Sequence, residues 1–215
     1  MKKNLFLISC FFLCLNVFSL EEAWLAMGFS YGNSIDLNQN SLNTTSSYKG
    51  SMGINLSTYG FWDHSKVGLY FYFAGWLPFV VHTAEEIGDY RSVAMEFVLG
   101  PGFRYRIGGN LTAVYGCGLD VFLEVDEYRK KTEGNQEYSM FAANFGLGGD
   151  IGLKIDIGRT FVVSIGSALS FHFLNSTTLK NQYNSYNEEK VNALFSVKPY
   201  IAIGFNRNRE NVSLS

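Results

Sequence analysis

The 215-residue sequence contains little charge, little proline and no long apolar segment beyond its N-terminal region. Charged residues make up 17% of the chain, which is below the roughly 25% of typical soluble domains. The formal net charge of -2 gives no reason to expect nucleic acid as a partner. No later segment approaches the roughly 20 consecutive apolar residues of a membrane-spanning helix. The sequence therefore argues against both a nucleic-acid-binding protein and a helical membrane protein.

Cysteine is also scarce, with three residues in the chain. Two of them, Cys10 and Cys14, fall in an N-terminal segment that we expect to be removed, which leaves Cys117 alone in the mature chain. A single cysteine excludes an internal disulfide framework and a cysteine-based metal site. The three histidines lie far apart in the sequence. We therefore expect no metal site and no cofactor.

The N-terminal residues have the features of a secretory signal peptide. Two lysines precede a mostly apolar stretch over residues 4–17, and Val17-Phe18-Ser19 fits the small-x-small pattern of a cleavage site. We predict a signal peptide over residues 1–19, cleaved after Ser19. Lipidation at Cys10 is an alternative, because Leu7-Ile8-Ser9-Cys10 matches a lipoprotein cleavage box by residue type.

Aromatic residues (16%) and 22 glycines are abundant, and the chain is dominated by alternation. In residues 191–205 every second residue from Val191 to Phe205 is apolar, and the residues between them are polar, small or mixed. A period of two predicts a β-strand with two different faces. A strand of this length with one apolar face suggests the closing strand of a membrane barrel.

Seven earlier segments show the same alternation. Long polar connections alternate with short ones along the chain, and the last long connection covers residues 174–190. This order is typical of an outer-membrane barrel with long extracellular loops and short periplasmic turns. We therefore predict an all-β fold, an eight-stranded antiparallel up-and-down transmembrane β-barrel. The predicted strands are residues 23–32, 48–58, 67–77, 92–106, 111–125, 138–155, 160–173 and 191–205.

Charged residues and most strand glycines lie on the face opposite the apolar one, as a narrow polar interior requires. We therefore expect the apolar face to contact lipid. The inverted arrangement, a soluble periplasmic lipocalin-like barrel that binds lipid inside, is the alternative. Aromatic residues near the strand ends would form two girdles. The predicted girdle residues are Phe29, Tyr31, Trp76, Phe79, Phe171 and Phe173 on the loop side, and Trp62, Phe103, Tyr105, Phe161 and Phe205 on the turn side.

The predicted interior carries charges of both signs. Because an isolated charge in a closed interior is costly, we hypothesise that Glu96, Asp120 and Asp150 pair with lysine and arginine in a lumen network. The alternative is that some of these groups lie in water near the mouths of the barrel. The predicted network residues are Glu96, Arg104, Arg106, Asp120, Glu124, Asp150, Lys154, His172 and Lys198.

Large inward side chains are expected to plug the lumen, because an eight-stranded interior is usually filled by side chains. The predicted plug consists of Tyr70, Tyr72, Phe122 and Tyr200, and it argues against a wide porin. No set of nucleophile, base and orienting group is recognisable from spacing, so we expect no enzymatic activity.

Pro199 presents a difficulty within the predicted closing strand, because proline cannot donate a ladder hydrogen bond and a closed barrel has no free edge. We predict that its missing donor faces a bulge or a position beyond the end of the first strand.

The segment Lys198–Phe205 (KPYIAIGF) resembles the C-terminal signal read by the barrel assembly machinery, with Tyr200 and Phe205 as its aromatic residues. The chain as a whole resembles OmpW-like and OmpX-like barrels and small spirochaetal outer-membrane proteins of unassigned function. The resemblance implies an outer-membrane location, contact with outer-membrane lipid, and the assembly machinery as a partner during biogenesis.

For function, we expect a surface-interaction or envelope role, with an extracellular or host ligand bound by the loops. A narrow channel for small, apolar molecules is the alternative that the OmpW-like resemblance implies. The chain would then consist of a signal peptide (1–19), a barrel domain (20–205) and a short periplasmic tail (206–215).

Overall fold

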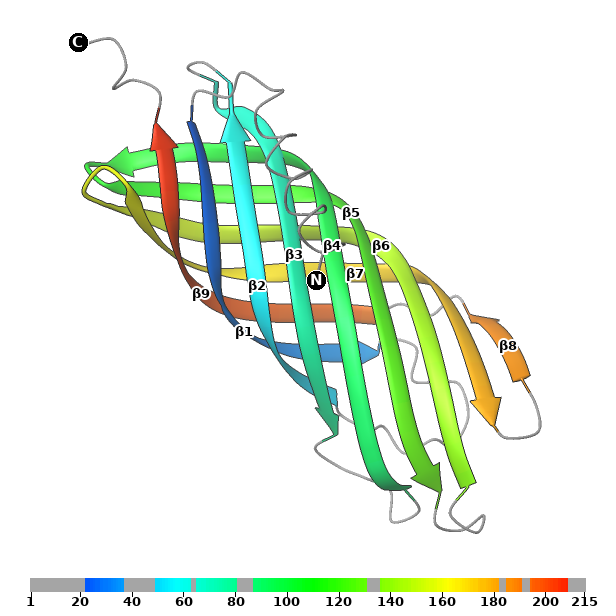
Figure 1. Ribbon diagram of the computed structural model, residues 1–215. Helices are drawn as coiled ribbons and strands as arrows, with labels where there is room; N and C mark the ends of the chain where they lie inside the picture. Colours follow the sequence, from blue (N-terminus) through cyan, green and yellow to red (C-terminus); the bar gives the residue numbers. More distant parts are fainter. Residues whose placement is uncertain are drawn as a thin grey trace, which may run out of the picture.

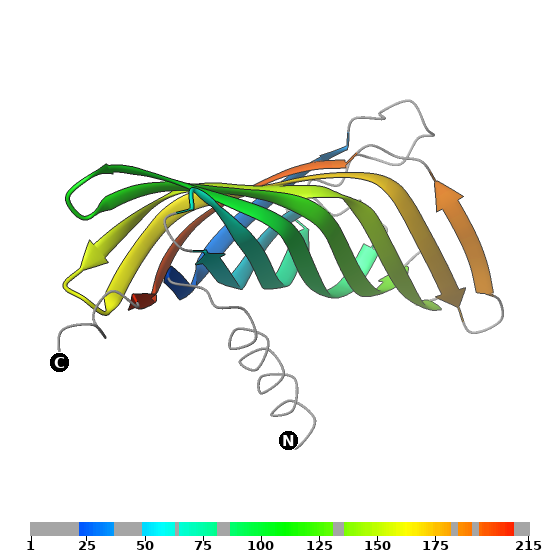
Figure 2. The same cartoon turned by 90° about the horizontal axis from the view of Figure 1, so that it is seen from above.

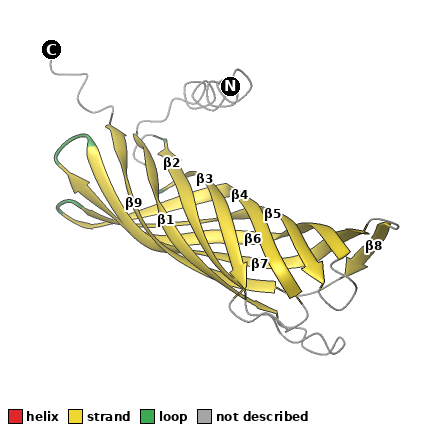
Figure 3. Cartoon of the chain, turned by 60° about the horizontal axis from the view of Figure 1, so that its bottom comes forward, coloured by secondary structure: helices red, strands yellow, loops and turns green. Residues whose placement is uncertain are grey.

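The computed structural model describes residues 22–36, 49–62, 65–80, 87–130, 136–181, 185–190 and 194–208. The predicted signal peptide and most of the predicted tail lie outside these ranges. Within them, no helix is long and apolar enough to cross a membrane. The regular elements of the described residues are all strands (Figure 3).

Eight strands form a closed antiparallel barrel, as predicted (Figure 1). Neighbours in the chain pair from β1 through β7, and β9 closes the ring by pairing with both β7 and β1. At two of the tight turns Gly109 and Gly158 have φ values of +50° and +68°, which glycine adopts without steric cost. The strands are β1 (Glu22–Asp36), β2 (Lys49–Phe61), β3 (Val67–Val80), β4 (Ile87–Gly108), β5 (Leu111–Lys130), β6 (Gln136–Ile157), β7 (Phe161–Asn181), β8 (Ser185–Lys190) and β9 (Leu194–Asn208).

The period of two places apolar side chains outside and polar or small side chains inside. On β9, Ile203 of the outer face is 65% exposed, while the adjacent inward Ala202 is 1% exposed. The inward Lys198 is buried on the same strand. The outer face presents large apolar side chains from every strand of the ring, whereas most buried polar and charged side chains face the lumen. The predicted assignment of the two faces is therefore confirmed, and the pattern is the reverse of that in a soluble barrel.

The prediction of a long loop over residues 174–190 is wrong. Strand β7 continues to Asn181, and β8 returns along it, with Ser176 opposite Glu189 and Lys180 opposite Ser185. Figure 2, seen from above, shows β8 beside the far end of β7. These segments are polar and lack an apolar face, so the alternation that identifies the barrel strands is absent.

A β-bulge in β7 lies directly after His172. Gly146 of β6 pairs with His172, but the preceding residue, Phe145, pairs with Leu174. Phe173 is therefore the extra residue, and both Phe173 and Leu174 are exposed on the outside. The bulge reverses the alternation beyond this point, which is the usual effect of one inserted residue.

Pro199 lies at an interruption of the ladder between β9 and β1. It pairs with Ser167 of β7. On the other side, neither Pro199 nor Lys198 pairs with a residue of β1. The register is the same on both sides of the gap, so this is no bulge, and β1 continues past it to Asp36. The predicted bulge and the predicted position beyond the end of the first strand are therefore both wrong. The ladder accommodates the missing N–H of Pro199 by leaving two pairs open.

Pro101 repeats this arrangement on β4. It pairs with Leu69 of β3, and the β4–β5 ladder has a two-residue gap between Leu99 and Gly102 with no change of register. The same physical cause, a residue without a backbone donor, thus accounts for two interruptions of the hydrogen-bond ladder.

Exposed aromatic residues mark both ends of the barrel wall. Phe161 and Phe205 pack 5.3 Å apart between ring centroids on the turn side, and Phe29 is 73% exposed on the loop side. Trp76, however, is buried in the lumen, so its assignment to the girdle is wrong. Its parity with Tyr70 and Tyr72 on β3 places it inside. The side chain of Phe79 lies outside the described residues.

Candidate functional site

The lumen contains a loop-side polar cluster formed by Glu96, Asp120, Ser170, His172 and Lys198. These side chains come from β4, β5, β7 and β9, and each lies on the inward face that alternation assigns to it. All five side chains are nearly inaccessible to solvent. Because the strands are tilted around a closed ring, residues far apart in the sequence meet at one level of the barrel.

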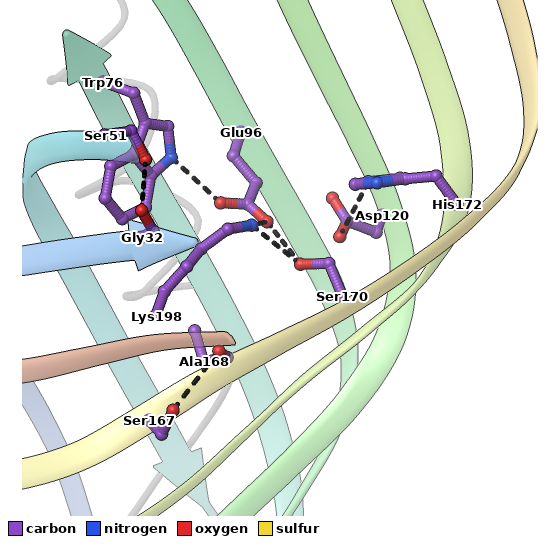
Figure 4. Close-up of polar contacts among 10 residues, drawn as sticks. All are labelled: Gly32, Ser51, Trp76, Glu96, Asp120, Ser167, Ala168, Ser170, His172 and Lys198. Atoms are coloured by element: carbon purple, nitrogen blue, oxygen red, sulfur yellow. Dashed lines mark hydrogen bonds and ion pairs between the residues drawn. The ribbon is translucent and has the colours of Figure 1, made fainter. Parts of the chain in front are cut away.

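Glu96 is the centre of this loop-side cluster (Figure 4). Its Oε1 accepts hydrogen bonds from Lys198 Nζ and from Ser170 Oγ, the latter at 2.6 Å. Lys198 also donates to Ser170 Oγ at 2.9 Å, and Trp76 Nε1 donates to Glu96 Oε2 at 3.0 Å. Both carboxylate oxygens of Glu96 are therefore engaged, and the Glu96–Lys198 ion pair is one that the lumen-network hypothesis includes.

Asp120 and His172 form the second part of the cluster. His172 Nε2 lies 3.2 Å from Asp120 Oδ2 (Figure 4), and each residue is 1% exposed. The imidazole ring also packs against Phe122, with ring centroids 5.8 Å apart. Asp120 therefore contacts an imidazole and not the lysine or arginine that the hypothesis assigned to it.

Asp150 is the centre of a separate turn-side cluster. Its carboxylate accepts hydrogen bonds from Tyr59 at 2.8 Å and from Tyr200 at 2.8 and 2.9 Å. No lysine or arginine among the described residues forms an ion pair with Asp150, so the predicted pairing is wrong there. Hydrogen bonds to a charged acceptor are stronger than neutral ones, and two tyrosine hydroxyls take the place of a cation.

Lys154 is fully buried near the turn end of the lumen. Its Nζ lies 2.9 Å from Asp156 Oδ1 and 4.5 Å from the centre of the Trp24 ring. One partner of Lys154 is therefore Asp156, a carboxylate two residues along the same strand that the hypothesis did not include.

The other predicted network residues lie near the mouths. Arg104 Nε donates to the Ser65 carbonyl oxygen at 2.9 Å, and the guanidinium lies over the Phe61 ring. Glu124 is buried near the loop end and accepts a hydrogen bond from Ser92 at 3.4 Å. Arg106 is exposed at the turn end. Arg106 therefore fits the alternative that some of these groups lie in water near the mouths, and it does not belong to the buried network.

The residues predicted as a plug all face inward. Tyr70 and Tyr72 are completely buried, Tyr200 is nearly so, and Phe122 packs against the same core. Aromatic side chains that the sequence prediction omitted complete the filling. These are Trp24, Tyr59, Phe61 and Trp76. Extending the alternation of β2 to residue 61 and of β3 to residue 76 would have identified three of them.

An apolar groove of about 1060 Å³ runs across the outside of the wall. It crosses β9, β1, β2, β3 and β4, and exposed side chains such as Phe29 and Ile201 line it. Gly75, on the outer face of β3, helps to form the hollow, because a Cβ atom there would meet nothing within 4 Å. Pro199 also lines the groove, so the groove adjoins the gap between β1 and β9.

Comparisons with known proteins identify the fold. No family model matches the sequence, and no curated protein matches it. The outer membrane protein OprG from Pseudomonas aeruginosa has a similar structure, with 14% identity and a TM-score of 0.53, over 88% of this chain and 97% of OprG. Neisserial surface protein A is similar over 85% of this chain and 96% of its own, with 7% identity and a TM-score of 0.50. The attachment invasion locus protein Ail of Yersinia pestis is similar over 87% of this chain and 99% of its own, with 13% identity and a TM-score of 0.49. The chain thus has the fold of the small eight-stranded outer-membrane β-barrels.

Proposed function

We propose that the protein is an integral outer-membrane barrel that presents its loop-side end at the cell surface and acts in surface interaction or envelope integrity, without catalysis. The observation that carries the proposal is the outer wall. Side chains such as Leu119, Ile203 and Phe29 are between 65% and 73% exposed there. A wall of this kind is unfavourable in water and favourable in lipid. The similarity to outer-membrane barrels in fold agrees with this location.

The filled lumen supports a structural or surface role over a wide pore. Large side chains, among them Trp76, Tyr59, Tyr70 and Tyr72, are completely or almost completely buried inside the ring. An eight-stranded barrel has room for little more than its own side chains. Free passage of hydrated solutes is therefore not expected.

The loop-side end supports surface interaction because it projects unevenly. Pairing between β3 and β4 ends at Trp76 and Ala94, whereas β4 continues seven residues further to Ile87, paired with β5. Strands β4 to β7, with β8 at their edge, thus extend beyond the rest of the ring (Figure 1). This projecting wall offers a surface for an extracellular or host ligand.

Cysteine labelling tests the location and orientation together. In a Cys117→Ala background, Lys180→Cys places a thiol on the projecting wall, and the matched variant Arg159→Cys places one at an exposed turn of the other end. With a membrane-impermeant maleimide on intact Gram-negative cells, we expect Lys180→Cys to be labelled and Arg159→Cys to be labelled only after permeabilisation. Equal labelling of both variants in intact cells, or recovery of the protein as a soluble periplasmic monomer, would contradict the proposal.

A narrow channel for small, apolar molecules is the second candidate. One observation favours it: the outer apolar groove adjoins the interruption of the β1–β9 hydrogen-bond ladder at Pro199. Such a solute would need no wide aqueous lumen. Uptake of a small apolar dye into lipid vesicles that contain the purified protein tests the candidate, and uptake equal to that of protein-free vesicles rejects it.

A further inference from the structure

The loop-side cluster brings three metal-ligating side chains to one point. Glu96, Asp120 and His172 come from β4, β5 and β7, and each offers an atom within 4.8 Å of the atoms offered by the other two. All three are buried. Two carboxylates and one imidazole at this spacing match the donor number and type of a metal site with three protein ligands.

Part of this cluster lacks hydrogen-bond partners. Among the described residues, no donor forms a hydrogen bond with either oxygen of Asp120, although His172 Nε2 lies 3.2 Å from Oδ2. In the described part of the chain, His172 Nδ1 has no hydrogen-bond partner either, although the residue is 1% exposed. A buried polar atom without a partner is costly and calls for an explanation such as an ion. This observation is independent of the clustering of the three residues.

The charges of the cluster also favour a bound cation. Glu96 and Asp120 are both acidic. In the described part of the chain, Lys198 pairs with Glu96, and no lysine or arginine pairs with Asp120. With His172 in the neutral form that a metal ligand requires, one net negative charge is left among Glu96, Asp120 and Lys198, and an uncompensated charge in a closed lumen is expensive. A divalent ion held by Asp120, His172 and Glu96 would balance the two carboxylates, and the Lys198 ammonium, no longer needed by Glu96, would move aside.

Further carboxylates lie on the loop side of the cluster. Glu124 and Asp126 follow Asp120 on the inward face of β5, at successive steps toward the loops, and both are buried. Acidic groups raise the local concentration of cations around them, so these two carboxylates add to the negative potential beside the cluster.

We propose that Glu96, Asp120 and His172 bind a divalent first-row transition metal ion such as Zn²⁺. The imidazole favours this class over Mg²⁺ and Ca²⁺, which prefer all-oxygen ligands. The ligands lie on three strands far apart in the sequence, so no spacing motif announces the site. This inference does not depend on the surface role proposed above.

Zinc titration of the mature chain, folded in detergent and stripped of metal with a chelator, tests the inference. We expect calorimetry to give one Zn²⁺ per chain. Asp120→Asn and His172→Gln should each weaken binding by about tenfold or more, since even changes in groups that support metal ligands cost this much. The matched control is Asp150→Asn, which changes a buried lumen carboxylate outside the cluster and should leave the affinity unchanged.

A second readout reports the ligands directly. Co²⁺ bound in place of Zn²⁺ should give visible absorption bands that change in His172→Gln, and each variant should keep the gel shift on heating that marks a folded barrel. Absence of a one-to-one complex in the wild-type protein would overturn the inference. Binding by a folded His172→Gln variant with wild-type affinity and an unchanged Co²⁺ spectrum would also overturn it.

Discussion

At the scale of single residues, a few buried carboxylates organise the interior, and each has a different set of hydrogen-bond and ion-pair partners. Glu96 has a lysine, a serine and an indole as partners, whereas Asp150 has two tyrosine hydroxyls. Alternation predicted that both carboxylates point inward. It could not predict their partners, because a period of two identifies the face of a residue and not the residue opposite it across the lumen.

The Glu96–Lys198 pair gives a prediction at this scale. Lys198→Met leaves the Glu96 carboxylate buried without its cation, and removing one partner of a buried ion pair costs about 3–5 kcal/mol. We expect a loss of this size in the free energy of unfolding, measured by urea denaturation in lipid vesicles. The double variant Glu96→Gln/Lys198→Met removes both charges and should recover much of the loss. A double variant as unstable as the single one would show that the two residues are not coupled.

At the scale of strands, the sequence pattern identifies the eight barrel strands and their faces but sets their ends too early. The strands within lipid need one continuous apolar face, and this need produces the alternation in β9 and its neighbours. Beyond the lipid no face must be apolar, so the outer parts of β7 and β8 read as loop. The bulge at Phe173 also ends the simple parity directly after His172.

Replacing Pro199 tests the cause of the interruption in the β1–β9 ladder. Replacement by valine supplies the N–H that proline lacks, opposite the open pairs of β1. We expect the ladder to close, and the backbone amide of the new valine should exchange with solvent as slowly as that of Ile201 in hydrogen-exchange NMR. Rapid exchange at position 199, with Ile201 still protected, would mean that proline is not the cause of the gap.

At the scale of the whole molecule, the distribution of polar and apolar side chains depends on the solvent that surrounds the wall. The ring closes because lipid offers no hydrogen-bond partner to a free strand edge, and the exterior is apolar because its side chains face lipid. The soluble lipocalin-like alternative needs the opposite arrangement, with an apolar interior and a polar exterior.

The most direct test places a charge on the middle of the wall. Ile201 is 55% exposed on the outer face of β9, and Ile201→Arg can be compared with the wild-type chain by urea denaturation in lipid vesicles. In lipid, arginine at mid-depth should reduce the free energy of unfolding by about 2–4 kcal/mol. A change within about 0.5 kcal/mol, as for an ordinary surface substitution in water, would contradict the account.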